Sequence, residues 1–321
     1  MRRLPRHGRP RAPQQGIALI TAIVLVAIAT VLATSIGFAS VMAAKRASAV
    51  FGADQALLAA EGAEAMAGYV LKQSGTTSGT DSLDQAWAQP YGPYELATGV
   101  TLQFAQIEDQ QGKFNINNLA AGNSALNQTY IEEFQHLLTL VGLESKWANL
   151  LADWIDSDNM PREPDGAEDD VYLGQTPPYR PPNLPISDIS EILALPGFGH
   201  DRYLKLAPYI SALPAGSTIN ICTARGEVLD AISGKDEYST DASTLVKSRQ
   251  QAGCFPTLAE FDASLSQAQV QALSGVVGTS SSYFRLRTFI TIGTARFSLY
   301  SLLYVDGGGT IRPIIRTFGT E

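Results

Sequence analysis

A long uncharged run near the N-terminus limits what this chain can become. Between Ile17 and Ala44 no residue carries a charge, and the first charge after the run is Lys45. About 20 apolar residues suffice to cross a bilayer as a helix, so the run predicts a single membrane span, here residues 17–44. Five arginines precede it: Arg2, Arg3, Arg6, Arg9 and Arg11. Arginines on one side only predict that the leader stays in the cytoplasm and that the C-terminal bulk of the chain is exported.

Gly16 lies at the polar-to-apolar junction, before the apolar run and not after it. An ordinary secretory signal has a short apolar core followed by a small-residue cleavage site, and this run is too long for that. Cleavage after Gly16 would remove the leader and leave a mature chain that begins at Ile17. The junction resembles a prepilin-type signal, which implies cleavage by prepilin peptidase and N-methylation of Ile17. An uncleaved signal anchor is the open alternative.

The helical pattern continues beyond the apolar run. Alanine and leucine are strong helix formers, and they recur to about Lys72. An unbroken helix over residues 17–72 would be about 85 Å long at 1.5 Å per residue. Its second half needs an apolar face, which we expect from Leu57, Leu58, Ala65 and Val70. The Gly-Ser-Thr stretch at residues 74–82 is expected to end the helix.

Helix signals dominate the middle of the chain. Thr129 and Glu132 have the spacing of a capping box, which predicts a helix start there. Trp147 and Trp154 fall on one stripe of the next predicted helix and are expected to be core residues. Further capping boxes open at Asp188 and Thr257, and the last short helix is expected to start at residues 266–269.

Strand signals flank these helices. Residues 101–108 predict a strand, and an Asn-rich turn and a second short strand follow at residues 112–119. Period-2 alternation predicts three further strands at the C-terminus: residues 283–292, 296–305 and 311–318. Pro313 places the last of them at a sheet edge.

Charge and cysteine content exclude some functions. The net charge is −8, which argues against a nucleic-acid partner because binding requires phosphates to be neutralised. The two cysteines, Cys222 and Cys254, could form one disulfide in an oxidising compartment, although two free thiols remain the alternative. No hydrolase, metalloprotease, phosphate-loop or dinucleotide motif occurs, so we expect no enzyme.

Acidic residues gather on an irregular segment after Trp154. Between residues 153 and 191 ten acids stand against two arginines. Carboxylate oxygens on a flexible loop suit Ca²⁺, but the segment is not an EF-hand because Met160 and Pro161 replace the required ligand and glycine. A solvated acidic loop is the open alternative.

The leader and long helix together resemble those of type IV pilins and type II secretion pseudopilins. Most members have Glu at the fifth mature position, where it pairs with the terminal amine of a neighbouring subunit; this chain has Thr21. That departure, the segments 108–119 and 218–224, and the acidic loop with residues 166–169 resemble the K-type minor pseudopilins. The resemblance implies a filament-tip subunit with a Ca²⁺ site, anchored by a single span in the bacterial inner membrane with the bulk of the chain in the periplasm. The expected ligands of the Ca²⁺ site are Glu168, Asp169 and Asp170, with Asp156, Asp158 and Asp165.

The resemblance also implies an α+β, pilin-like fold, with a long N-terminal helix on an antiparallel sheet. A sterile-alpha-motif-like helical domain would be inserted in it. The Gly-rich turn at residues 195–199 fits that domain, and a DNA-binding helix-hairpin-helix is its alternative. The expected divisions are leader 1–16, membrane helix 17–44, first pilin-like part 45–122, inserted domain 123–277 and second pilin-like part 278–321.

The function implied is nucleation of the type II secretion pseudopilus for export of folded proteins across the outer membrane. Expected partners are the I, J and H types of minor pseudopilin, prepilin peptidase, the inner-membrane assembly platform and an exoprotein substrate, with no nucleic acid. The alternatives are a minor type IV pilin at a pilus tip, acting in adhesion or DNA uptake, and an uncleaved periplasmic calcium-binding membrane protein.

Overall fold

The computed structural model describes residues 15–120 and 124–319. Helix α1 (Gln15–Ser78) is longer than predicted at both ends, and it continues into the Gly-Ser-Thr stretch that was expected to stop it. Most of the predicted leader lies outside the described residues. From residue 16 to residue 51 every side chain of α1 is exposed, and this stretch is long and apolar enough to cross a membrane. An apolar helix without a polar face is stable only in lipid or among partner helices.

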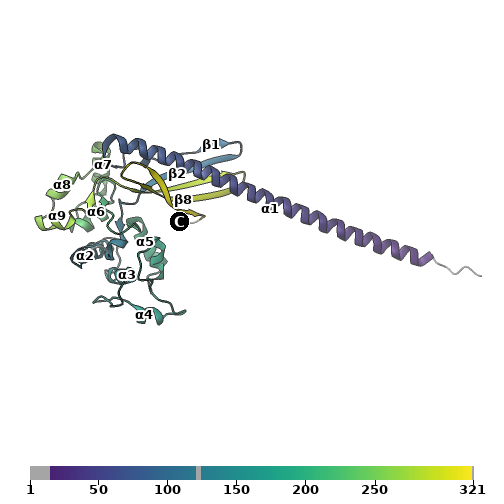
Figure 1. Cartoon of the computed structure of the whole chain (residues 1–321), viewed down its shortest axis with the longest axis horizontal. Coiled ribbons are helices and arrows are strands. Elements are labelled where there is room, and N and C mark those ends of the chain that lie inside the picture. Colours follow the sequence, from purple (N-terminus) through teal and green to yellow (C-terminus); the bar gives the residue numbers. More distant parts are fainter. Residues whose placement is uncertain (1–14, 121–123, 320–321) are drawn as a thin grey trace, which may run out of the picture. The chain divides into compact units, whose positions relative to one another are not determined.

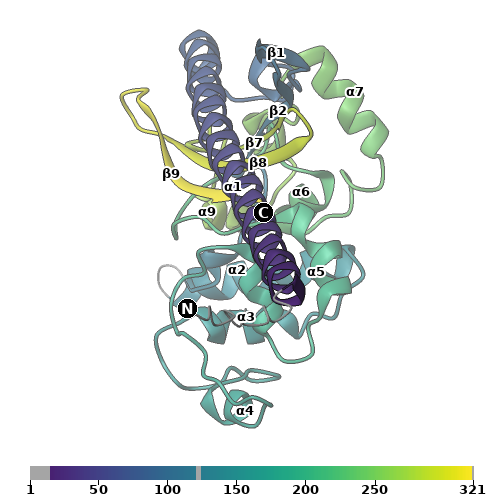
Figure 2. The same ribbon diagram turned by 90° about the vertical axis from the view of Figure 1, so that its right-hand side faces the viewer.

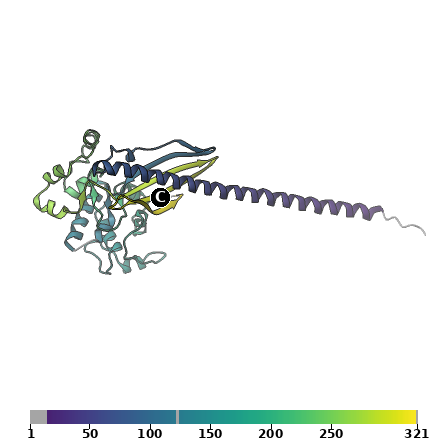
Figure 3. The same ribbon diagram turned by 45° about the horizontal axis from the view of Figure 1, so that its top comes forward.

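The chain from Leu58 onward forms a second compact unit, built around a five-stranded antiparallel sheet of order β1-β2-β7-β8-β9 (Figure 1). Its strands are β1 (Tyr94–Ala97), β2 (Val100–Asp109), β7 (Tyr283–Ile292), β8 (Ala295–Val305) and β9 (Ile311–Phe318). Four of them match the predicted strands closely, and β1 was not predicted. β9 forms one edge, as Pro313 predicted, and Figure 3 shows the strands side by side.

The second half of α1 covers one face of this sheet. Its buried residues Ala60, Ala63, Ala67 and Leu71 share a core with residues of β2, β7 and β8 and with Trp87, which precedes β1. Trp87 packs edge-on against Phe284 with ring centroids 5.2 Å apart. The predicted face was wrong at three of its four residues, because Leu57 is 37% exposed, Leu58 is 68% exposed and Ala65 is also exposed. Val70 is the predicted residue that packs against this core. Small alanines face the sheet because they let the helix approach it closely.

The helical part lies between β2 and β7 in sequence. Its α-helices are α2 (Ser124–Leu140), α3 (Trp147–Ile155), α4 (Asp169–Leu173), α5 (His200–Leu206), α6 (Gly226–Ser233), α7 (Ala242–Ala252), α8 (Leu258–Ala263) and α9 (Gln267–Leu273). Its 3-10 turns are η2 (Ile116–Ala120), η3 (Ile189–Ala194) and η4 (Ala207–Tyr209), and a further 3-10 turn, η1 (Ala86–Ala88), precedes β1. Short parallel pairs join β3 (Phe114–Asn115) to β4 (Ile210–Ser211) and β5 (Ile219–Asn220) to β6 (Val277–Gly278).

The helix-start signals had mixed outcomes. The capping boxes at Asp188 and Thr257 are present as predicted. The last short helix, α9, starts where it was predicted, and Ser266 caps it with a capping box of its own. The box at Thr129 was wrong, because α2 begins at Ser124 and Thr129 lies inside it. The spacing of a capping box also occurs by chance within a helix, where the hydroxyl is not needed as a cap.

A separate hydrophobic core holds the helical part together. Phe114 stacks on Phe134 with ring centroids 5.2 Å apart, and Trp147 packs edge-on against Phe198 at 5.1 Å. Both predicted core tryptophans, Trp147 and Trp154, are buried. In Figures 1 and 2, α4 lies at the end of the helical part farthest from the sheet.

A disulfide joins Cys222 to Cys254 across a sequence separation of 32, so the free-thiol alternative does not describe this structure. Closing a loop of that length stabilises the fold by about 3–4 kcal/mol in the chain-entropy account. Arg249 connects the same two segments, because its guanidinium donates hydrogen bonds to the carbonyl oxygens of Ile221 (2.8 Å) and Phe255 (2.8 Å).

Candidate metal centre

Three carboxylates converge where the loop after α3 returns to α4. Asp156 is the residue immediately after α3, Asp158 follows two residues later, and Glu168 is the N-cap of α4. One carboxylate oxygen from each lies within 4.8 Å of the others. This arrangement brings together acids that are separated by twelve positions in the chain.

Three of the carboxylate oxygens in this group lack hydrogen-bond partners in the described structure. Glu168 is only 3% exposed, and both its carboxylate oxygens, with Oδ1 of Asp156, are buried without a hydrogen-bond partner in the described structure. Burial raises the pKa of Glu168 to about 7, and the charges of Asp153, Asp156, Asp158 and Asp169 add to the effect. Unpaired carboxylates of this kind are unfavourable unless they are protonated or a cation joins them.

The group fits a hard divalent cation. Ca²⁺ accepts six to eight oxygen ligands in flexible geometry, and the loop offers carboxylate oxygens and main-chain carbonyls. Asn183 adds a buried amide oxygen without a partner, while its Nδ2 donates to the carbonyl oxygen of Asp158 (2.9 Å). Asn183 was not among the ligands expected from the sequence.

The other predicted ligands lie outside this group. Asp169 forms an ion pair with Arg180 (3.0 Å), and the Asp170 carboxylate accepts the N–H of Val171 (2.9 Å). Asp165 has a left-handed backbone conformation (φ 70°) at the loop turn. The structure therefore groups Asp156, Asp158 and Glu168 and does not add Asp165, Asp169 or Asp170 to them.

Sequence reasoning missed Asp153 as a residue of this site. Its carboxylate is fully buried and accepts the main-chain N–H of Arg162 (3.1 Å) and of Ala167 (2.9 Å). Burial and the nearby Asp156 raise the pKa of Asp153 to about 6, against the hydrogen bonds and the charge of Arg162. The available signal was its place one helical turn before Asp156, on the buried side of α3 with Trp154.

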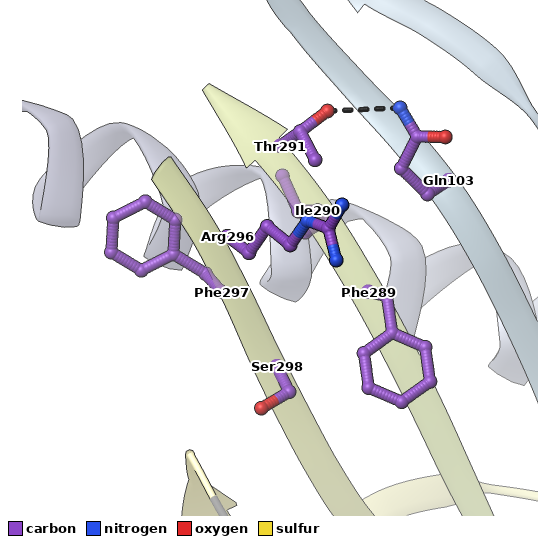
Figure 4. Close-up of a pocket in the computed structure, with 7 residues that line it drawn as sticks. All are labelled: Gln103, Phe289, Ile290, Thr291, Arg296, Phe297 and Ser298. Carbon is purple, nitrogen blue, oxygen red and sulfur yellow. Dashed lines mark hydrogen bonds between the residues drawn. The ribbon is translucent and has the colours of Figure 1, made fainter. Parts of the chain in front are cut away.

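A shallow depression of about 590 Å³ lies on the sheet at β2, β7 and β8. Figure 4 shows the Gln103 amide donating to the Thr291 hydroxyl (2.9 Å), with Phe289 and the cationic Arg296 beside them. The residues that line it include no carboxylate, histidine or cysteine. It therefore offers neither a metal site nor an acid–base pair.

The Gly-rich turn before α5 does not favour DNA. Gly197 and Gly199 have positive φ, as a tight turn requires. Arg202, the cation beside the turn, pairs through two nitrogens with Glu144 (3.1 Å each). A phosphate would have to displace that carboxylate, so the turn is better explained as a connection between η3 and α5.

Comparison with known proteins decides the family. A family model described as type II secretion system protein K matches residues 112–215. Over 96% of its length the chain is 32% identical to the type II secretion system protein K of Pseudomonas aeruginosa, of which it covers 94%. The chain belongs to the type II secretion system protein K family. A second protein K, from Klebsiella pneumoniae, is 29% identical over 95% of the chain and 94% of the relative.

A solved member of the protein K family has the same fold. The structure described as the GspK-GspI-GspJ complex from the type 2 secretion system of enterotoxigenic Escherichia coli matches with a TM-score of 0.74 and 26% identity. The match covers 86% of this chain and all of that one. It confirms the predicted pilin-like fold with its helical domain. A PilX N-terminal model also matches residues 15–63, as expected for a pilin-type anchor helix.

Proposed function

We propose that this chain is the tip minor pseudopilin of the type II secretion system and nucleates the pseudopilus that exports folded proteins. The observation that supports this most directly is the whole-chain similarity to protein K, including a relative solved in complex with GspI and GspJ. The I, J and H types are therefore the proposed partners, together with prepilin peptidase, the assembly platform and an exoprotein. The PilX-like match covers only the anchor helix, so it does not favour a type IV pilus over secretion.

Thr21 supports the position at the tip. Its hydroxyl donates to the carbonyl oxygens of Ile17 (3.1 Å) and Ala18 (3.0 Å), so it is satisfied within its own helix. It has no charge with which to pair the terminal amine of another subunit, and a buried amine without a partner is costly. A subunit with Thr21 is therefore suited to the first place in a filament.

We expect Thr21→Glu to leave processing unchanged and to allow the subunit into the pseudopilus shaft. The measurement is the copy number of protein K per filament, obtained by isolating the full-length chain with its native pseudopilins. The wild type should be found with the I and J types and in far fewer copies than the shaft subunit. If the variant formed tip complexes with wild-type stoichiometry, Thr21 would not determine position. Wild-type chains throughout the shaft would contradict the tip proposal itself.

Cleavage after Gly16 is the second part of the proposal. Gly16 lies in the first turn of α1 with no other atom within 4 Å of a Cβ placed there, so a side chain would not disturb the fold. We expect Gly16→Leu to block cleavage, and intact mass with N-terminal sequencing of membrane-isolated chains is the test. The wild type and the matched variant Gly37→Leu, whose site is equally open, should both begin at methylated Ile17. A Gly16→Leu chain that begins at Ile17 would place recognition elsewhere.

We also propose that Asp156, Asp158 and Glu168 bind Ca²⁺. The support is the set of buried carboxylate oxygens without partners. The ion would neutralise their mutual repulsion and hold the long loop between α3 and α4 in one conformation. A loop fixed in this way would give the tip a defined surface for its partners.

A further inference from the structure

The loop between the proposed ligands closes around one buried carboxylate. Asp153 is fully buried in α3, and its Oδ2 accepts the N–H of Arg162 (3.1 Å) and the N–H of Ala167 (2.9 Å). Arg162 follows Asp158, and Ala167 immediately precedes Glu168. A single oxygen therefore fixes the main chain on both sides of the loop and sets the distance between the first two proposed ligands and the third.

Arg162 connects this carboxylate to a proposed ligand. Its Nε lies 3.2 Å from Oδ1 of Asp153, and its Nη2 lies 2.7 Å from Oδ2 of Asp156. The guanidinium thus occupies one oxygen of Asp156, and the other oxygen, Oδ1, is buried without a partner. A planar guanidinium holds a carboxylate in a fixed orientation, so Arg162 determines which oxygen of Asp156 remains for a cation.

Gly166 allows the loop to close this tightly. Its N–H donates to the carbonyl oxygen of Arg162 (2.8 Å). A Cβ at this position would overlap the main-chain N and O of Arg162 and the Oδ2 of Asp153. All three atoms are fixed by the hydrogen bonds above, so the loop would have to open to admit a side chain. Gly174, at the end of α4, would place a Cβ in ordinary contact, 3.4 Å from the carbonyl oxygen of Val171.

We propose that Asp153 and Arg162 are positioning residues that preform the cation site, with Gly166 as the residue that lets the loop close on them. Asp153 sets the spacing of the three ligand-bearing segments, and Arg162 orients Asp156. The inference rests on the proposed Ca²⁺ site. Groups that orient metal ligands from behind typically change metal affinity by about 10–100-fold when they are removed.

The test is titration of Ca²⁺ into the full-length chain in detergent micelles, by calorimetry and by the Ca²⁺-dependent shift in Tm. Asp153→Ala, Arg162→Gln and Gly166→Ala should each weaken Ca²⁺ affinity by about 10–100-fold, although each retains the three proposed ligands. Gly174→Ala is the matched control and should bind as the wild type does. Asp153→Asn should recover most of the affinity, because its amide oxygen can accept the same two N–H groups. Glu168→Gln, which alters a ligand, should bind weakly without lowering the Tm measured in chelator.

The outcomes of this titration distinguish failure of the calcium proposal from failure of the positioning inference. A wild-type chain that binds no Ca²⁺ at millimolar concentration overturns the calcium proposal and this inference with it. A wild type that binds, with Asp153→Ala, Arg162→Gln and Gly166→Ala within about threefold of it, leaves the site standing and overturns the positioning inference. If Asp153→Asn is as weak as Asp153→Ala while Arg162→Gln binds as the wild type does, then Asp153 is itself a ligand and the positioning inference is overturned. If Asp153→Ala does not fold, Arg162→Gln tests the positioning inference in its place. The Arg162 side chain is 29% exposed, so its replacement disturbs the core less than that of the buried Asp153.

Discussion

Replacing Glu64 with alanine is expected to lower the free energy of unfolding by about 2–4 kcal/mol. Glu64 is the buried carboxylate on the sheet-facing side of α1. It accepts hydrogen bonds from Nη2 of Arg316 (2.6 Å), Nε of Arg316 (2.9 Å) and the Ser301 hydroxyl (2.7 Å). These hydrogen bonds join α1 to both β8 and β9. The Arg316 side chain is 40% exposed and can regain water, so most of the cost comes from the buried Ser301 hydroxyl and the lost pair.

The effect of Glu64 should also depend on pH. Burial opposes ionisation, but the hydrogen bonds from Arg316 and Ser301 outweigh it and lower the pKa of Glu64 below 4.5. The Glu64–Arg316 pair therefore makes its full contribution to the free energy of unfolding above pH 4.5. That contribution is lost as the pH falls through the lower pKa that Glu64 has in the folded state. The difference between wild type and Glu64→Ala should shrink under acid conditions.

Urea unfolding of the full-length chain in detergent micelles measures this effect. A Trp147→Phe/Trp154→Phe background leaves Trp87 as the single tryptophan, whose emission can be excited selectively, and Trp87 lies in the core between α1 and the sheet. Glu61→Ala, one turn away and partly exposed, is the control and should change stability little. Arg316→Ala should weaken the fold at least as much as Glu64→Ala, because it leaves the buried Glu64 carboxylate without its cation. Equal stability of Glu64→Ala and wild type would show that the contacts of Glu64 with Arg316 and Ser301 do not hold α1 on the sheet.

The sheet could be predicted largely from the sequence because period-2 alternation reports a half-buried surface directly. β7 and β9 have the predicted ends, and β8 begins one residue earlier than predicted. β1 was missed because all four of its residues are exposed, so no alternation marks it. It is a strand because its main chain pairs with β2, and side-chain patterns do not record that.

The face of α1 was harder to predict for a related reason. In an alanine-rich helix several faces look equally apolar, and the choice between them is made by residues far away in sequence. Glu64 lies on the buried face only because Arg316, 252 positions later, reaches it. An acid in the middle of an apolar stripe therefore argued against the correct face when the helix was considered alone.

Prediction from the sequence was limited in the same way for the acidic loop between α3 and α4. Composition and resemblance predicted an acidic calcium loop with six candidate ligands, but an irregular segment has no period that places side chains relative to one another. The structure groups Asp156, Asp158 and Glu168 because Asp153 and Gly166 fold the loop back on α3. Asp153 was overlooked because it accepts hydrogen bonds from main-chain N–H groups. Residues of any type supply such groups, so no pattern of residue spacing marks the acceptor in the sequence.

The second large effect is expected at Glu133, which should make the protein less stable as the pH rises. Glu133 lies on α2 and is 7% exposed, and its Oε2 has no hydrogen-bond partner in the described structure. Burial, with a smaller effect of Glu132, raises the pKa of Glu133 from 4.5 to about 8. Between these values the folded chain holds a proton that the unfolded chain releases, so stability falls as the pH rises. At about 1.4 kcal/mol per pH unit, the loss between pH 4.5 and pH 7 is about 3 kcal/mol.

Glu133→Gln should remove the fall of stability with pH that Glu133 causes and should stabilise the chain at pH 7 by about 2 kcal/mol. This gain is smaller than the loss of about 3 kcal/mol because the amide N–H of Gln is left without an acceptor. The measurement is urea unfolding of the full-length chain in detergent micelles from pH 5 to pH 8 with chelator present. Other buried acids, such as Asp109, titrate in both proteins, so the difference between variant and wild type isolates Glu133. Glu132→Gln, on the exposed side of the same helix, should leave the pH profile nearly unchanged. Parallel profiles for Glu133→Gln and wild type would mean that Glu133 is ionised in the folded protein, so that its burial must be compensated by a cation.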